Sequence, residues 1–271
     1  MNEHEVNNGY RIAVPAEFEE VFTHFYFDEN TTAEPISRTV LPSYQTIMIF
    51  NFGPPVSFLT TPGNQVSIPP VVVTGPVRQL VHYIMPPGSA MLIANFKDDA
   101  FFRFFGIALV CETAVHPDEL INSNCFTMLW NELNRMPDND ARVKYLLDFC
   151  RPYLKERNNL MEQIAEFRNG HVSPIKELSG RNDLTERAVQ LHHKKLLGYS
   201  AKEIARYQRF LKAVRMLQEI TAAAPKVDWF EVIAECGYYD QSQLIHDFKH
   251  YLQLSPSKYL KLQQDICNPR P

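Results

Sequence analysis

The last third of the sequence contains two copies of one helical unit, and this duplication restricts the fold of the chain more than any other feature. Taking Ser200 and Ser255 as equivalent positions sets the two copies 55 residues apart. With this offset, apolar residues mostly fall on apolar residues, as Val189 does on Leu244, and capping residues fall on capping residues. Such repetition indicates one supersecondary structure that occurs twice. We therefore expect an all-α C-terminal domain made of two similar units.

The second copy begins with a short predicted helix and a tight turn. Apolar spacing predicts a helix over Trp229 to Cys236, with one apolar face formed by Phe230, Ile233 and Ala234. Gly237 follows at the position where a helix commonly ends in the left-handed conformation, which glycine adopts without a Cβ clash. A second helix after this turn would complete a helix-turn-helix unit.

That second helix is expected over residues 241–252. Asp240 is placed to accept from the N–H groups at its start, and Gln243 can reach back as in a capping box. The buried stripe should comprise Leu244, Phe248 and Tyr251 or Leu252. The outward side then presents groups that pair with bases or phosphates, namely Gln241, Ser242, Gln243, His246 and Lys249. On this helix alone, an ordinary solvated face is the simpler explanation, but the cap, turn and repeat together favour DNA reading.

A long helix is expected between the two copies. Ser200 and Glu203 form a capping-box pattern at its start. One face of this helix is apolar, through Ile204, Tyr207, Leu211, Val214 and Leu217. Such a rigid spacer can hold two recognition helices about one DNA turn apart, roughly 34 Å. Pro256, after Ser255, suits the first position of a last short helix.

The first 110 or so residues are expected to form a β-sandwich or barrel. Short apolar runs predict strands over Thr46 to Phe52, Val71 to Thr74 and Met91 to Phe96. Turn-forming clusters separate them, at Gly53 to Pro55, Thr61 to Asn64 and Pro86 to Gly88. From about 118 to 168 the spacing becomes helical, through Phe126, Leu129, Trp130, Leu133, Val143, Leu146, Leu147, Phe149, Leu160, Ile164 and Phe167. A linker is expected over residues 168–172.

Charge is segregated along the chain. Residues 170–271 hold 15 Lys and Arg against 11 Asp and Glu, a net charge of +4, whereas the residues before them carry a net charge of −8. A basic segment behind an acidic front half fits phosphate binding by one part only. The five scattered cysteines favour reduced thiols over disulfides or a zinc site. With no long apolar run and no secretory signal pattern, the sequence predicts a cytoplasmic protein without membrane attachment.

The C-terminal motifs resemble those of the AraC/XylS family of bacterial transcription regulators. The segment ECGYYDQSQLIHDFKHYLQLSPSKYL, residues 235–260, is similar to the family signature, and LTERAVQLHHKKLLGYS, residues 184–200, is similar to its upstream unit. The front half resembles, less specifically, a cupin-like sensory domain of one subgroup, through YRIAVP at Tyr10 and MLIANFKDDAFFRFFGI at Met91. The resemblance implies an α+β protein with a β-barrel or sandwich sensory domain and accessory helices over 1–168, and a double helix-turn-helix domain over 169–265.

The resemblance also implies a function and a set of site residues. We expect a sequence-specific DNA-binding transcription regulator that is modulated by an effector through its N-terminal domain. Contacts to double-stranded DNA are carried over to Arg187, Gln190, Lys194, Lys195, Gln241, Ser242, Gln243, His246 and Lys249. Further expected partners are RNA polymerase, a small-molecule effector and a second copy of the chain. We expect no enzymatic activity, metal or cofactor, because catalytic motifs are missing and the histidines ahead of Gly170 are dispersed.

Six positions depart from the family pattern and leave a second interpretation open. Gln253 replaces the usual Gly, and Ala201 replaces the usual Pro. Leu191 and His246 stand where an arginine usually contacts DNA, and His192 and His193 stand where an apolar residue and Phe usually enter the core. We interpret the paired histidines as packing residues rather than metal ligands. The alternative function is a degenerate helix-turn-helix protein that serves as a protein-interaction or ligand-sensing module without specific DNA readout.

Overall fold

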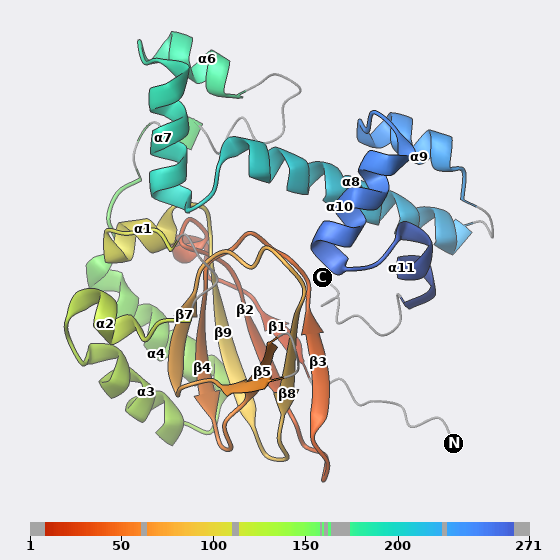
Figure 1. Cartoon of the computed structure of the whole chain (residues 1–271). Helices are drawn as coiled ribbons and strands as arrows, with labels where there is room; N and C mark the ends of the chain where they lie inside the picture. The colour runs from red at the N-terminus through yellow and green to blue at the C-terminus, as the bar shows by residue number, and fades with distance from the viewer. Residues whose placement is uncertain are drawn as a thin grey trace.

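The computed structural model describes residues 9–60, 64–109, 114–157, 159, 162–163, 174–223 and 227–262. It contains an N-terminal β-domain flanked by helices, and a C-terminal set of helices that lies across one end of the strands (Figure 1). The α+β class expected from the sequence is therefore confirmed. The predicted helix around Leu160 to Phe167 and the predicted linker at 168–172 lie largely outside the described residues, as do residues 61–63 of one predicted turn.

Two antiparallel sheets form the β-domain. Within the described residues, one sheet has the strand order β1 (Tyr10–Ile12), β2 (Phe22–Glu29), β9 (Ala90–Phe96), β4 (Ile47–Phe52) and β7 (Val71–Thr74). The other has the order β3 (Ile36–Val40), β8 (Val81–Met85), β5 (Ser57–Thr60) and β6 (Asn64–Ser67). The three strands predicted from apolar runs are β4, β7 and β9. β4 and β7 are buried along their whole length, which explains their nearly continuous apolar sequence.

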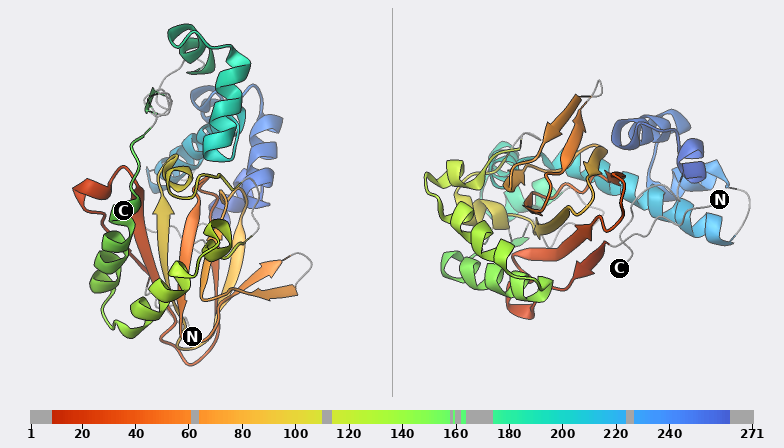
Figure 2. Two further views of the ribbon diagram at one scale, coloured as in Figure 1. Left: turned by 90° about the vertical axis from the view of Figure 1, so that its left-hand side faces the viewer. Right: turned by 90° about the horizontal axis from the view of Figure 1, so that it is seen from below.

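Helices cover the outer side of the larger sheet. They are α1 (Ala100–Phe105), α2 (Pro117–Ile121), α3 (Cys125–Arg135) and α4 (Asn139–Cys150), with short 3-10 helices at Ala16–Phe18 and Arg151–Tyr153. Seen from below, α2 to α4 lie along one side of the β-domain (Figure 2). The predicted apolar residues of α3 and α4 pack into one cluster with Phe50 and Leu92 of the sheet. Trp130 also donates from Nε1 to the Asn51 carbonyl oxygen at 2.7 Å, which ties α3 to the end of β4.

The C-terminal helices confirm the repeat that the sequence predicted. They are α6 (Pro174–Arg181), α7 (Glu186–Leu197), α8 (Ala201–Ala223), α9 (Trp229–Cys236), α10 (Gln241–Leu252) and α11 (Pro256–Leu262). Both ends of α6 and α7 map onto both ends of α9 and α10 with the offset of 55, and the starts of α8 and α11 do as well. The turn after α7 and the turn after α10 are also equivalent, because Gly198 and Gln253 both adopt positive φ, at 80° and 57°. The left-handed conformation is costly for Gln253, which has a Cβ atom.

The predicted apolar face of α9 is wrong for two of its three residues, whereas Ile233 packs against the core as expected. Phe230 is 85% exposed and Ala234 is exposed, whereas Val232 and Cys236 are buried. Both pairs have the i, i+4 spacing of a helical face, so periodicity in eight residues cannot choose between them. Packing against α8 decides the matter, since the Cys236 Sγ atom lies 3.9 Å from the Met216 Sδ atom.

In the described part of the chain, none of the helices is both long and apolar enough to span a bilayer. The longest, α8, carries charged residues along its whole length.

Candidate nucleic-acid interface

The start of α10 is built by two side-chain caps. Asp240 Oδ1 accepts from the backbone N–H of Gln243 at 2.7 Å, and Gln243 Oε1 accepts from the backbone N–H of Tyr239 at 2.9 Å. The predicted capping arrangement is present, although Gln243 bonds the residue before the cap rather than the cap itself. Bidentate pairing with adenine needs both the oxygen and the nitrogen of a carboxamide. In this conformation the oxygen of Gln243 is already used, which leaves Gln241 as the stronger candidate for adenine readout.

The outward face of α10 carries three exposed residues in a row. Ser242, His246 and Lys249 follow one another at the i, i+4, i+7 spacing of one helical face, and Gln241 is exposed beside them. The opposite face is buried, through Leu244, Asp247, Phe248, Tyr251 and Leu252. The predicted stripe is thus confirmed, with Asp247 as an addition that the sequence reading missed.

Asp247 holds α10 against α8. Its side chain is 2% exposed, and its two oxygens bind two arginines of α8: Oδ1 lies 2.6 Å from Arg206 Nε, and Oδ2 lies 3.1 Å from Arg209 Nη2. A buried carboxylate is tolerated when its charge is paired and hydrogen-bonded in this way. The only sequence signal was an acidic residue on the buried side of a helix, together with two arginines spaced i, i+3 on the preceding helix.

The first unit presents a similar face on α7. Thr185 caps this helix by accepting from the Ala188 N–H at 3.2 Å. The four predicted contact residues are all exposed: Arg187, Gln190, Lys194 and Lys195. Leu191 lies among them and is 62% exposed, so an apolar side chain occupies the middle of this face. Apart from the half-buried Gln243, the predicted contact residues are thus exposed on α7 and α10. The long helix α8 lies between these two helices along the chain (Figure 1).

The two adjacent histidines of α7 have different environments. His193 is buried, and its Nδ1 lies 2.9 Å from the Tyr199 carbonyl oxygen, as expected of a packing residue. His192 is exposed, so the expectation that both histidines pack inward is wrong for this one. Adjacent helix positions point about 100° apart, so only one of the two can face the core. In the part of the chain that the structure describes, no three His, Cys, Asp or Glu side chains are grouped to hold a metal.

A tyrosine from the β-domain penetrates the core of the C-terminal helices. Tyr44, in the loop between β3 and β4, is 6% exposed and adopts φ of 52°. Its ring centroid lies 4.6 Å from that of Tyr207, 5.3 Å from that of Tyr199 and 6.3 Å from that of Tyr251. The Tyr207 hydroxyl donates to the carbonyl oxygen of Pro42 in the same loop. One loop of the β-domain thus contacts the end of α7, α8 and α10 together.

A second contact lies at the end of α7. Arg78 Nη2, from the loop between β7 and β8, donates to the Gly198 carbonyl oxygen at 2.7 Å. A Cβ atom on Gly198 would lie 2.4 Å from the carbonyl oxygen of Leu109, so the backbones approach too closely for any other residue. These contacts orient the first helix-turn-helix unit on the β-domain.

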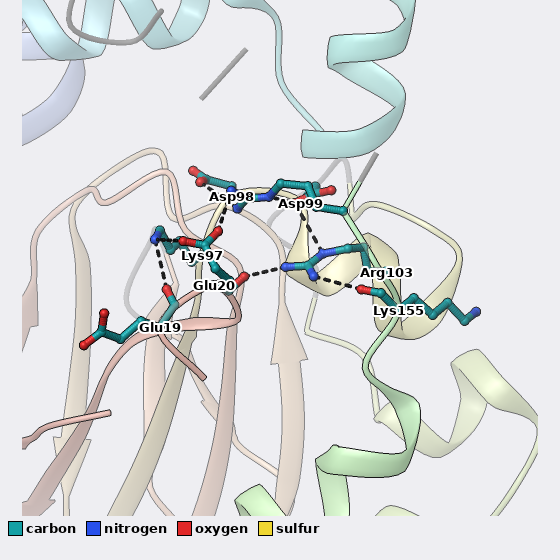
Figure 3. Close-up of polar contacts among 8 residues, drawn as sticks. Glu19, Glu20, Lys97, Asp98, Asp99, Arg103 and Lys155 are labelled. Atoms are coloured by element: carbon teal, nitrogen blue, oxygen red, sulfur yellow. Dashed lines mark hydrogen bonds and ion pairs between the residues drawn. The ribbon is translucent and has the colours of Figure 1, made fainter. Parts of the chain in front are cut away.

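A cluster of charged residues anchors the segment that leads toward the C-terminal helices. Arg103 reaches from α1 toward Asp99, the backbone of Glu20 and the carbonyl oxygen of Lys155 (Figure 3). Arg157 adds ion pairs to Glu20 at 2.6 Å, Asp98 at 3.1 Å and Asp99 at 3.3 Å. The hydrogen bond from Lys97 and the positive charge of Arg157 lower the pKa of Glu20. The chain is therefore fixed to the β-domain up to residue 157.

A cavity of about 740 Å³ lies between the two sheets and beneath α8. Its walls are largely apolar, with Ile47, Ile49, Phe58, Met91 and Ile93 from the strands and Phe210, Leu211 and Val214 from α8. Arg11 and Arg215 supply positive charge, and none of the described lining residues is Asp or Glu. Burial and the nearby Arg11 lower the pKa of His24 to about 4, so this lining histidine is neutral at pH 7. The phenylalanines of α1 do not line this cavity: Phe101, Phe104 and Phe105 pack in the cluster of the larger sheet, and Phe102 packs against the cluster of the C-terminal helices.

Residues 178–262 match the model of a family described as a helix-turn-helix domain. The matched segment starts within α6 and ends with α11. It therefore includes both recognition helices and the long helix that joins them. A search of curated proteins found none that match.

Several solved structures are similar at low sequence identity. ToxT from Vibrio cholerae shares 11% identity, with 88% of this chain and 97% of that chain covered, at a TM-score of 0.40. ToxT from V. cholerae strain SCE256, bound to an unsaturated fatty acid, shares 13% identity over 96% of this chain and 97% of that chain, at a TM-score of 0.38. Protein NMB1881 from Neisseria meningitidis shares 9% identity over 36% of this chain and 89% of that chain, at a TM-score of 0.23.

Proposed function

Since residues 178–262 form a helix-turn-helix domain of the AraC/XylS family, as the sequence resemblance predicted, we propose that this protein regulates transcription by binding specific sequences in double-stranded DNA. The observation that carries the proposal is the exposure of the reading faces. Arg187 and Gln190 on α7, and Gln241, Ser242 and His246 on α10, are all exposed while the opposite faces of both helices are buried. Capped helix N-termini at both units add affinity for phosphate.

The proposal assigns two kinds of contact to α10. Gln241 reads a base, because an exposed carboxamide near the N-terminus of a recognition helix can pair with an adenine edge. Lys249 binds phosphate, because an ammonium group is a donor-only point charge without the geometry of a base edge. These roles differ in their dependence on DNA sequence and on salt.

Replacing Gln241 with alanine should relax base choice at one position of the selected site and cost about 1–3 kcal/mol of specific binding. Lys249→Ala, the matched control on the same face, should weaken binding to all sequences alike and reduce the salt slope by about one. The measurement is selection from a random DNA pool, followed by salt titrations on the selected duplex and a scrambled one. Gln243 is left intact because its oxygen caps the helix. An unchanged consensus for Gln241→Ala would contradict the assignment.

The same titration separates this function from the interaction-module alternative. A regulator that neutralises several phosphates loses affinity steeply as salt increases, even on random duplex. A module without DNA readout would show almost no binding at low salt. Action on RNA polymerase and pairing with a second copy of the chain are predictions from the family resemblance.

We infer further that the β-domain controls DNA binding through a small effector held in the cavity beneath α8. The inference is supported by the lining, which joins strands of both sheets to α8 and to Gln253 and Tyr259 of the second unit. A molecule in this space would contact both parts of the protein at once. Apolar walls with Arg11 and Arg215 and without carboxylates favour an apolar molecule that carries a negative charge.

An anionic apolar dye should bind this cavity and respond to its charge. We expect 1-anilinonaphthalene-8-sulfonate to bind with enhanced fluorescence, and Arg215→Gln to weaken its binding by about tenfold. Binding of the neutral N-phenyl-1-naphthylamine should not change in this variant. Lys202→Gln is the control, because this exposed lysine of α8 does not line the cavity. An equal loss of affinity for the anionic dye in Lys202→Gln and Arg215→Gln would contradict the effector site, and so would the absence of dye binding to the unaltered protein.

A further inference from the structure

His246 is the middle residue of the outward face of α10, and an arginine of α8 bonds one of its ring nitrogens. Arg206 Nη2 lies 3.0 Å from His246 Nδ1. A guanidinium group carries only hydrogen-bond donors. Nδ1 must therefore be the acceptor in this bond, and the ring hydrogen of the neutral imidazole resides on Nε2.

Arg206 is itself held in place by buried partners. Its Nε donates to Asp247 Oδ1 at 2.6 Å, and its Cζ lies 5.6 Å from the centroid of the Tyr251 ring. Asp247 also binds Arg209, so the carboxylate cannot turn away without breaking two ion pairs. Asp247, Arg206 and His246 thus form a chain of hydrogen bonds from the buried side of α10 to its exposed side. A supporting partner of this kind selects the tautomer of a functional histidine.

We propose that Arg206 is a positioning residue that makes His246 a base-reading donor. With Nδ1 occupied, His246 offers one N–H group, at Nε2, to the floor of the major groove. Guanine presents two acceptors there, adenine presents N7 and thymine presents O4, whereas cytosine presents an amino donor that would meet the imidazole N–H unfavourably. The second unit should therefore prefer guanine and reject cytosine at the position that His246 faces. This specificity rests on the DNA-binding function proposed above.

The tautomer can be observed without DNA. In long-range ¹H–¹⁵N correlation spectra of the full-length protein above pH 7, His246 should show the shifts of a protonated Nε2 and an unprotonated Nδ1. Arg206→Lys keeps a positive charge beside Asp247 but removes the planar group that bonds both residues at once. It should shift His246 toward a mixture of both tautomers. An Nδ1-protonated ring in the unaltered protein would overturn the proposal.

Base preference is then measured on four duplexes that differ at one position only. This is the position of the selected site at which the His246→Ala protein no longer distinguishes the four bases. We expect about tenfold tighter binding to guanine than to cytosine for the unaltered protein. This ratio should fall close to one for His246→Ala and decrease clearly for Arg206→Lys. Lys249→Ala is the control, since it should lower all four affinities and keep their ratio.

The outcomes separate this inference from the function on which it rests. Salt-dependent DNA binding in which His246→Ala alters no base preference would overturn the reading role of His246 and leave the regulator function intact. A purified protein that ignores every duplex in dilute buffer would overturn both. Loss of preference in Arg206→Lys with an unchanged His246 tautomer would assign Arg206 a merely structural role and reject the proposal.

Discussion

Replacing Asp247 with alanine is expected to lower the free energy of unfolding of the C-terminal helices by about 3 kcal/mol. The substitution removes the shared partner of Arg206 and Arg209, whose side chains are only 30% and 26% exposed, and leaves two positive charges against each other on α8. It also removes both ion pairs by which Asp247 links α10 to α8. The second recognition helix should then lose its fixed orientation, and specific DNA affinity should fall more than affinity for random duplex.

Urea denaturation followed by tryptophan fluorescence measures this effect. Trp229 in α9 reports on the second unit, and a Trp130→Phe background removes the emission of the other tryptophan. Asp247→Asn should lose less than Asp247→Ala, because the amide oxygen still accepts from one arginine. Glu219→Ala, which removes an exposed carboxylate of α8, should change stability by less than about 0.5 kcal/mol. A loss below 1 kcal/mol for Asp247→Ala would show that the ion pairs are not what holds α10.

Replacing Tyr44 with alanine should uncouple the β-domain from the C-terminal helices. The ring fills a buried space between Tyr199, Tyr207 and Tyr251, and its removal leaves a cavity at the contact between the two parts. Removal of a buried aromatic side chain costs about 3–5 kcal/mol in protein cores. We expect the lower end of this range here, because the loop can partly collapse into the space that the ring leaves. The positive φ at this position strains alanine as much as tyrosine, so it does not alter the difference between the two proteins.

Calorimetry of the full chain detects the uncoupling. The unaltered protein should unfold in one main transition, and Tyr44→Ala should show two, with the C-terminal helices melting first because they lose part of their core. Tyr145→Ala, which truncates a partly exposed tyrosine of α4 away from this contact, should leave a single transition. If the β-domain controls DNA binding through this loop, dye binding in the cavity should affect DNA affinity in the unaltered protein and no longer in Tyr44→Ala. A single, unshifted transition for Tyr44→Ala would contradict the coupling role of this side chain.

The bounds of the C-terminal helices were readable from the sequence because their signals are local. Asp240 and Thr185 act on backbone groups three residues away, and Gly198 and Gly237 end helices through their own φ angles. The repeat then supplied an independent check, since the lengths of α9 and α10 recur in α6 and α7. The strands β4, β7 and β9 were equally accessible, because strands buried on both faces carry uninterrupted apolar runs.

Other features depended on contacts between residues far apart in the chain. The apolar spacing in α9 predicted that Phe230 is buried. Packing against α8 buries Val232 and Cys236 instead. The pairing of Arg206 with His246 and Asp247 joins residues that are 40 and 41 positions apart, and the Tyr207 hydroxyl meets Pro42 across 165 positions. Apart from the acidic residue on the buried side of α10 and the two arginines of α8, no sequence pattern marks such partners. The exposed residues of α7 and α10 that we propose to contact DNA were thus predictable from the sequence. Their hydrogen-bond partners and the packing of their helices on the β-domain were decided by tertiary structure, because hydrogen bonding and burial depend on which distant side chains arrive at the same place.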